Sequence, residues 1–205
     1  MKLSHAKVAT LAATLITFGS LTGINAATLF SFSPPASGTS GVIGVDGVAF
    51  TPSVDILVSS LGYYDQDGDG LPGNFEVGVY EFSSQTLVAP SVSISSSSTL
   101  AVDNFRYEPV PTITLNAGQQ YLVAGFAPVA ADYAAALSSG LTVDPDVTYD
   151  GYFYDLTGAL SFPTTSDPTL YFGGPNLQFS SIPEPSATIL IWLGALSLVT
   201  RRRTT

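Results

Sequence analysis

The sequence contains no cysteine, one histidine (His5) and only six lysines and arginines among 205 residues. The absence of cysteine excludes a disulfide framework, a cysteine-ligated zinc or iron–sulfur site, and a thiol nucleophile. Between Lys7 and Arg201 the only basic residue is Arg106, and this interior holds neither histidine nor lysine. It therefore lacks the residues for a Ser-His-Asp triad, a Schiff-base lysine, a P-loop lysine or a histidine metal site. We expect a protein that is not an enzyme.

Acidic side chains dominate the charge. Sixteen aspartates and glutamates against six lysines and arginines give a net charge of −10. All sixteen acids lie within residues 27–185, where Arg106 is the only base and the net charge is −15. Binding to nucleic acid requires a basic face, so we expect no nucleic-acid partner. Such a body should stay soluble and resist contact with acidic polysaccharide unless cations intervene.

The first 26 residues are typical of a secretory signal peptide. Lys2 and Lys7 give a basic start, an apolar run covers Val8–Phe18, and small and polar residues lead to Ala26. This order suits signal peptidase, with Ala26 at the −1 position. The alternatives are a membrane anchor or a buried helix, but the run is short for a span and is broken by threonines. We expect residues 1–26 to be removed on export.

The last 23 residues combine three features in order. Pro183, Glu184 and Pro185 end the preceding structure, an uncharged and largely apolar stretch covers residues 187–199, and three arginines follow. We expect a short transmembrane helix over 187–199 in the inner membrane. The cationic cluster should keep its far end on the cytoplasmic side. These three basic residues are Arg201, Arg202 and Arg203.

This three-part tail resembles the PEP-CTERM sorting signal of exopolysaccharide-producing Gram-negative bacteria. The resemblance implies recognition by an exosortase, which is an integral-membrane cysteine protease, and removal of the tail near Pro183–Pro185. The mature chain would then reach the cell surface or the extracellular matrix, where exopolysaccharide is a candidate partner. The alternative is a plain C-terminal tail anchor.

Residues 27–182 are long enough for one domain with a substantial core. Short runs with alternating hydrophobicity recur between glycine, proline, aspartate and serine, which predicts an all-β, jelly-roll-like β-sandwich. A two-turn helix is expected over Ala130–Leu137. The expected strands are Thr28–Phe32, Val42–Phe50, Val54–Tyr63, Glu76–Phe82, Leu87–Ile94, Phe105–Val110, Thr112–Leu115, Tyr121–Phe126, Tyr149–Asp155, Leu170–Phe172 and Leu177–Phe179.

Part of this body also resembles an uncharacterised bacterial β-sandwich family that is often found upstream of PEP-CTERM tails. The resemblance implies a fold without an assigned activity, and it covers about residues 45–127. The segments that carry it are Val48–Pro52, Leu61–Asp65, Glu76–Tyr80, Phe105–Tyr107 and Leu115–Tyr121.

One stretch has the ligand spacing of an EF-hand calcium loop. Asp65, Asp67 and Asp69 occupy positions 1, 3 and 5, a glycine occupies position 6, Leu71 would offer its carbonyl at position 7, and Glu76 occupies position 12. Closely spaced carboxylates repel one another, which favours a bound cation. We therefore predict a Ca²⁺ site.

The surroundings of this stretch differ from an EF-hand. Strands rather than helices are expected on both sides, so the approach of Glu76 is the least defined of the five ligands. The alternative is a solvated Asp/Gly turn, for which both residue types are ordinary choices. We expect Arg106 to pair with a nearby carboxylate or to stack on an aromatic ring.

Three functions remain after these exclusions. The first is a non-catalytic surface or matrix protein whose sandwich is stabilised by a cation. The second is a lectin-like module that binds carbohydrate through Ca²⁺ and exposed tyrosines, although packing of most tyrosines in the core is the simpler expectation. The third is a two-carboxylate glycoside hydrolase, for which the acids lie mostly in turns, where water keeps them ionised.

Overall fold

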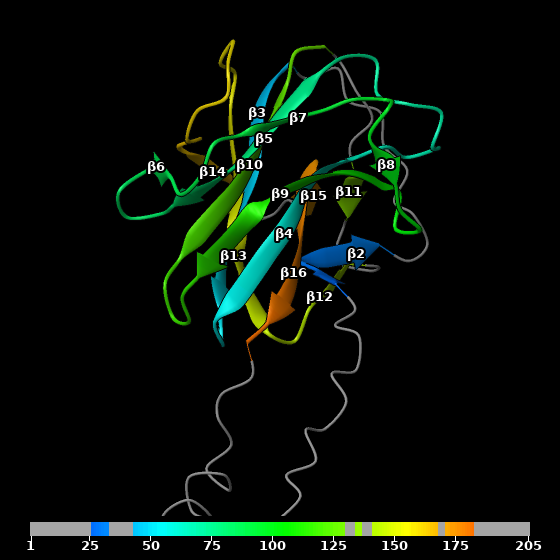
Figure 1. Ribbon diagram of the computed structural model, residues 1–205. Coiled ribbons are helices and arrows are strands. Elements are labelled where there is room, and N and C mark those ends of the chain that lie inside the picture. The colour runs from blue at the N-terminus through cyan, green and yellow to red at the C-terminus, as the bar shows by residue number, and fades with distance from the viewer. Residues whose placement is uncertain (1–25, 33–42, 130–133, 137–140, 168–170, 183–205) are drawn as a thin grey trace, which may run out of the picture.

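The computed structural model describes residues 26–32, 43–129, 134–136, 141–167 and 171–182. All regular elements in these ranges are β-strands, and none is a helix, so the all-β prediction is confirmed (Figure 1). The expected signal peptide and C-terminal tail fall outside them, apart from Ala26. A search of the same ranges finds no helix long and apolar enough to cross a membrane.

Two antiparallel sheets form a sandwich-like fold and lie over one another (Figure 1). The order in the first sheet is β1 (Ala27–Thr28), β16 (Pro175–Ser181), β4 (Ile56–Tyr64), β9 (Phe105–Leu115) and β8 (Thr99–Leu100). The order in the second sheet is β14 (Thr165–Asp167), β13 (Val147–Asp155), β3 (Gly44–Pro52), β10 (Tyr121–Ala127), β5 (Phe75–Glu81) and β6 (Thr86–Leu87), while β7 (Val92–Ile94) also pairs with β5. Two small sheets pair β11 (Ala134–Ala136) with β15 (Tyr171–Gly173) and β12 (Leu141–Val143) with β2 (Phe30–Phe32).

Strand β10 shows how a continuously apolar strand builds a core on both faces of its sheet. Tyr121 and Val123 join the main hydrophobic cluster between the sheets, whereas Leu122 and Ala124 join a second cluster on the opposite face. Successive side chains of a strand point to opposite faces, so an apolar residue at every position buries both sides of the sheet. The second sheet is therefore covered on both faces along β10.

The outer cover of the second sheet is aromatic. Phe162 lies after β13 and its ring meets Tyr80 at 5.8 Å and Phe82 at 5.3 Å between ring centroids, while Phe82 meets Phe153 at 5.4 Å. All three pairs are edge-to-face, which is a favoured geometry for aromatic rings. The segment after β13 thus folds back over this face and closes it.

The helix expected over Ala130–Leu137 is wrong where the structure describes it. Ala134–Ala136 form β11, which pairs with Tyr171–Gly173. Alanine favours a helix in isolation, but the propensity is worth well under 1 kcal/mol per residue and strand pairing overrides it.

Prolines displaced two strand boundaries from their expected places. The two strands expected on either side of Pro111 are one strand, β9, whose pairing with β4 skips from Pro109 to Ile113. The strand expected over Leu87–Ile94 is instead two, β6 and β7, separated around Pro90. Proline cannot donate a backbone hydrogen bond, so a ladder either bulges around it or stops.

Candidate cation site

Three loops meet at the end of β4. The first, residues 65–74, connects β4 to β5, the second, residues 95–98, connects β7 to β8, and the third, residues 101–104, connects β8 to β9. The Asp65 amide donates to the Asn104 carbonyl at 2.8 Å, and the Asn104 side-chain amide donates to the Gln66 carbonyl. The acidic loop is thus held by a turn about forty residues away in the sequence.

This arrangement brings Asp65, Asp67 and Asp69 together. Each offers a carboxylate oxygen, and the three oxygens lie within 4.8 Å of one another. Asp65 is buried, whereas Asp67 and Asp69 are exposed. Gly68 (φ 76°) and Gly70 (φ 119°) adopt backbone angles that side chains other than glycine rarely take, which permits the tight path. Three of the five predicted ligand residues are therefore grouped as a cation site requires.

The Asp65 carboxylate is only partly satisfied. It is 1% exposed, and its Oδ2 accepts a hydrogen bond from Arg106 Nε at 2.5 Å. Its Oδ1 is buried and has no hydrogen-bond partner. A buried unsatisfied acceptor costs about 1–3 kcal/mol, and more when it is charged. A cation bound beside Asp67 and Asp69 would satisfy this atom, and an all-carboxylate oxygen set suits hard ions such as Ca²⁺ or Mg²⁺.

Glu76 lies differently from the three aspartates. Phe75 enters the core, so its neighbour Glu76 faces the other side of β5, where its carboxylate accepts from the Ser91 hydroxyl at 2.5 Å. The aspartate group does not include Glu76. The Leu71 side chain belongs to the core, and the ligand role of its backbone carbonyl stays a prediction. The EF-hand spacing therefore predicts the grouping of Asp65, Asp67 and Asp69. Glu76 at position 12 points elsewhere because a strand, and not a helix, follows the loop.

The prediction that Arg106 pairs with a carboxylate is confirmed by its bond to Asp65. No sequence signal marks Asn104 or the Ser96 and Ser98 carbonyls as parts of this site. The two serine carbonyls accept hydrogen bonds from Arg106. No spacing motif connects these residues to the acidic loop, because strand pairing and not local sequence brings them there.

Asp103, in the third loop, lies in a partly buried position. Burial raises the pKa of its carboxyl, while hydrogen bonds from the Tyr107 hydroxyl at 3.0 Å and from the Phe105 amide oppose the rise. The same burial and the neighbouring Asp103 charge hold the pKa of Tyr107 far above its usual range. Tyr107 thus remains a hydrogen-bond donor at any ordinary pH.

Most tyrosines are buried in the part of the chain where side chains are described. Six of them are buried and two are half-buried, which confirms the expectation that most pack within the sandwich. A carbohydrate ring stacks on an exposed aromatic face, which the six buried rings do not supply. The eight are Tyr63, Tyr64, Tyr80, Tyr107, Tyr121, Tyr149, Tyr152 and Tyr154.

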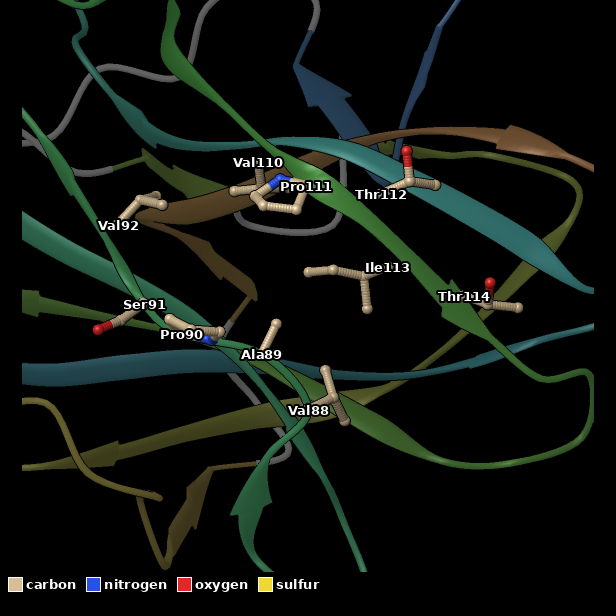
Figure 2. Close-up of a pocket in the computed structure, with 10 residues that line it drawn as sticks. All are labelled: Val88, Ala89, Pro90, Ser91, Val92, Val110, Pro111, Thr112, Ile113 and Thr114. Carbon is tan, nitrogen blue, oxygen red and sulfur yellow. The ribbon is translucent and has the colours of Figure 1, made fainter.

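A shallow groove separates the segment before β7 from the second half of β9. Val88–Val92 line one wall, and Val110–Thr114, the part of β9 that carries Pro111, line the other (Figure 2). The lining contains no acidic or basic side chain. A two-carboxylate hydrolase needs a pair of acids across its cleft, and this groove does not provide one.

Comparison with models of known protein families finds no match for this chain, and comparison with curated proteins also finds none.

Proposed function

We propose that this is an exported, non-catalytic protein of the cell surface or extracellular matrix, stabilised by a Ca²⁺ ion at Asp65, Asp67 and Asp69. An exosortase would process its C-terminus. The proposal includes the jelly-roll-like arrangement of the sandwich and the transmembrane helix over residues 187–199. The observation that carries it is the order of elements at the two ends: a basic and apolar leader ending in Ala26, and a proline, apolar and arginine tail.

The fold supports a surface role through the direction of its ends. β1 pairs with β16, with Ala27 opposite Phe179, so both ends of the described body leave from neighbouring strands. Ser181 pairs with Ile56 at the start of β4, whereas Asp65 follows directly after its end. The end of β16, after which the tail begins, and the acidic loop are therefore separated by the length of β4, about 25–30 Å. A chain held by its tail would present the loop away from the membrane.

The surface charge fits an extracellular environment crowded with polymers. Arg106 is the only basic residue among those the structure describes, and it is 8% exposed. The described surface thus carries carboxylates without opposing cationic side chains, so it repels other copies and acidic polymers. Contact with an acidic exopolysaccharide would then depend on bridging cations.

Processing is tested by following both termini in a host with and without its exosortase. We expect a mature N-terminus at Ala27, and loss of the tail near Pro185 only in the host with exosortase. Replacing Pro183 and Pro185 by alanine should leave the tail attached, and Ala26→Arg should block the first cleavage. Intact mass and cell fractionation measure both events. The uncut 205-residue chain in the cytosol would contradict the proposal.

Cation binding should raise the thermal stability. A ligand at 100 times its Kd stabilises a folded protein by about 2.7 kcal/mol, which corresponds to roughly 5–10 °C in Tm for a domain of this size. We expect this rise on adding CaCl₂ and its reversal by EDTA, measured by calorimetry. D67N/D69N should lose the shift because the exposed half of the ligand set is gone. D55N makes the same carboxylate-to-amide change at the other end of β4 and should keep it. A Tm of the wild-type protein that does not respond to EDTA would refute the Ca²⁺ site.

A further inference from the structure

The Arg106 guanidinium bonds to two of the three loops around the candidate cation site. Its Nε donates to Asp65 Oδ2 at 2.5 Å and its Nη2 donates to the Gly68 carbonyl at 3.1 Å, both in the acidic loop. Its Nη1 donates to the carbonyls of Ser96 and Ser98 at 2.8 and 3.0 Å. One side chain thus connects the two loops through four acceptors, which only the planar, five-donor arginine fork can do.

The bond to Asp65 also selects which oxygen is available. Arg106 occupies Oδ2, and Oδ1 is the atom left buried without a partner. A carboxylate held by one oxygen in a buried pair has little freedom to rotate, so the position of the second oxygen is determined by the first bond. Gly68 lies between Asp67 and Asp69 in the sequence. The hydrogen bond from Arg106 to its carbonyl therefore restricts the backbone that carries both exposed ligands.

Arg106 further sets the charge of the site. Asp65, Asp67 and Asp69 carry three negative charges when ionised, and the guanidinium reduces the local sum to −2. A divalent cation then gives a neutral assembly, which is favourable where Asp65 and Arg106 are buried.

We infer that Arg106 is a positioning residue for a divalent-cation site made of Asp65 Oδ1, Asp67 and Asp69. It orients Asp65, holds the loop backbone at Gly68 and sets the site's charge to match a divalent ion. This inference rests on the cation site proposed above and adds what organises it and which ionic charge it prefers. Residues that orient metal ligands without touching the metal typically change affinity by about 10–100-fold.

Two substitutions separate geometry from charge. Arg106→Lys keeps the positive charge but cannot reach four acceptors, so Ca²⁺ affinity should fall at least about tenfold, with the preference between Tb³⁺ and Ca²⁺ unchanged. Arg106→Gln loses both the positive charge and the four hydrogen bonds, so Ca²⁺ affinity should fall similarly. The preference should also move several-fold towards Tb³⁺, because the site becomes more negative by one charge and Tb³⁺ carries one more positive charge than Ca²⁺. Calorimetric titration with Ca²⁺ and Tb³⁺ luminescence measure the two affinities.

The controls separate this inference from its premise. Q119E adds the same unit of negative charge in the turn beyond the opposite end of β9 and should bind both ions like the wild type. D67N/D69N should bind neither. If the wild-type protein binds no Ca²⁺, the cation site itself is overturned. If it binds and both Arg106 variants match it within about twofold, the positioning role is overturned.

A measurement on the unmodified chain covers the case in which the variants do not fold. Arg106 is buried, so its Nε–H should give a slowly exchanging NMR signal, and Ca²⁺ should slow that exchange further because the ion holds Asp65 in place. Faster exchange on adding Ca²⁺ would show that the ion takes Asp65 away from Arg106 and would overturn the inference.

Discussion

The free energy of unfolding is expected to fall by about 2–3 kcal/mol between about pH 5 and pH 8, with Asp46 as the main cause. Asp46 lies on β3, where Tyr63 donates its hydroxyl to Oδ1 at 3.2 Å and the backbone at Gly174 closes over the other oxygen. A Cβ at residue 174 would lie 2.2 Å from Oδ2, which shows how closely the chain encloses this carboxylate.

The direction follows from the pKa. Burial raises the pKa of Asp46 from its usual value of 3.8 to about 7, although the hydrogen bond from Tyr63 opposes the rise. The folded protein therefore binds a proton that the unfolded chain has already released over this range. The stability from that proton is complete below the unfolded pKa and is lost as the pH rises through the folded pKa. The full difference corresponds to about 4 kcal/mol, of which the stated interval covers the larger part.

Urea denaturation at a series of pH values measures this loss, with EDTA present throughout so that cation binding does not contribute. D46N is neutral at every pH and should remove most of the slope, whatever its effect on absolute stability. D150N makes the same carboxylate-to-amide change at an exposed aspartate of β13 and is the matched control. A D46N slope equal to that of the wild type would show that Asp46 is ionised in the folded protein at neutral pH.

Replacing Phe105 by alanine is expected to cost about 3–5 kcal/mol of stability, the usual range for removing a buried aromatic ring. Phe105 is fully buried, and its ring centroid lies 5.1 Å from Tyr64, 5.8 Å from Phe30 and 6.0 Å from Tyr107. Its neighbours come from three strands, so they cannot collapse together to fill the space that the ring leaves.

Equilibrium denaturation of F105A against the wild type measures this loss. F105L keeps most of the volume and should cost clearly less than F105A. L156A removes a side chain that is 75% exposed and should change stability by less than about 0.5 kcal/mol. A loss below about 1 kcal/mol for F105A would mean that the aromatic cluster does not stabilise this end of the sandwich.

The strand content could be predicted because alternation is a local property. The alternating run Val54–Tyr63 is predicted within two residues of β4, and the short, continuously apolar run Tyr121–Phe126 within one residue of β10. The same reasoning failed at Ala134–Ala136. There the residues carry no alternation, and only the partner strand, Tyr171–Gly173, determines their conformation.

The candidate site, too, could be predicted from the sequence only in part. The spacing of Asp65, Asp67 and Asp69 lies within five consecutive residues, so the sequence alone predicted that they would converge. Glu76 could not be placed by spacing, because its direction depends on whether a helix or a strand follows the loop. The bond between Arg106 and Asp65 joins residues forty-one positions apart. The presence of a single base in an acidic body predicted a carboxylate partner, but did not identify which one.

By itself, then, the sequence determined what depends on residue type and near neighbours: an all-β body, a surface of one charge, a cluster of three carboxylates, and a body without histidine or cysteine. The tertiary structure alone decided that Asp65 keeps one oxygen buried and unpartnered, that Arg106 connects two loops beside it, and that this loop lies at the far end of β4 from Ser181, where β16 ends. These features depend on sheet register, which is set by contacts between distant strands through the shared core.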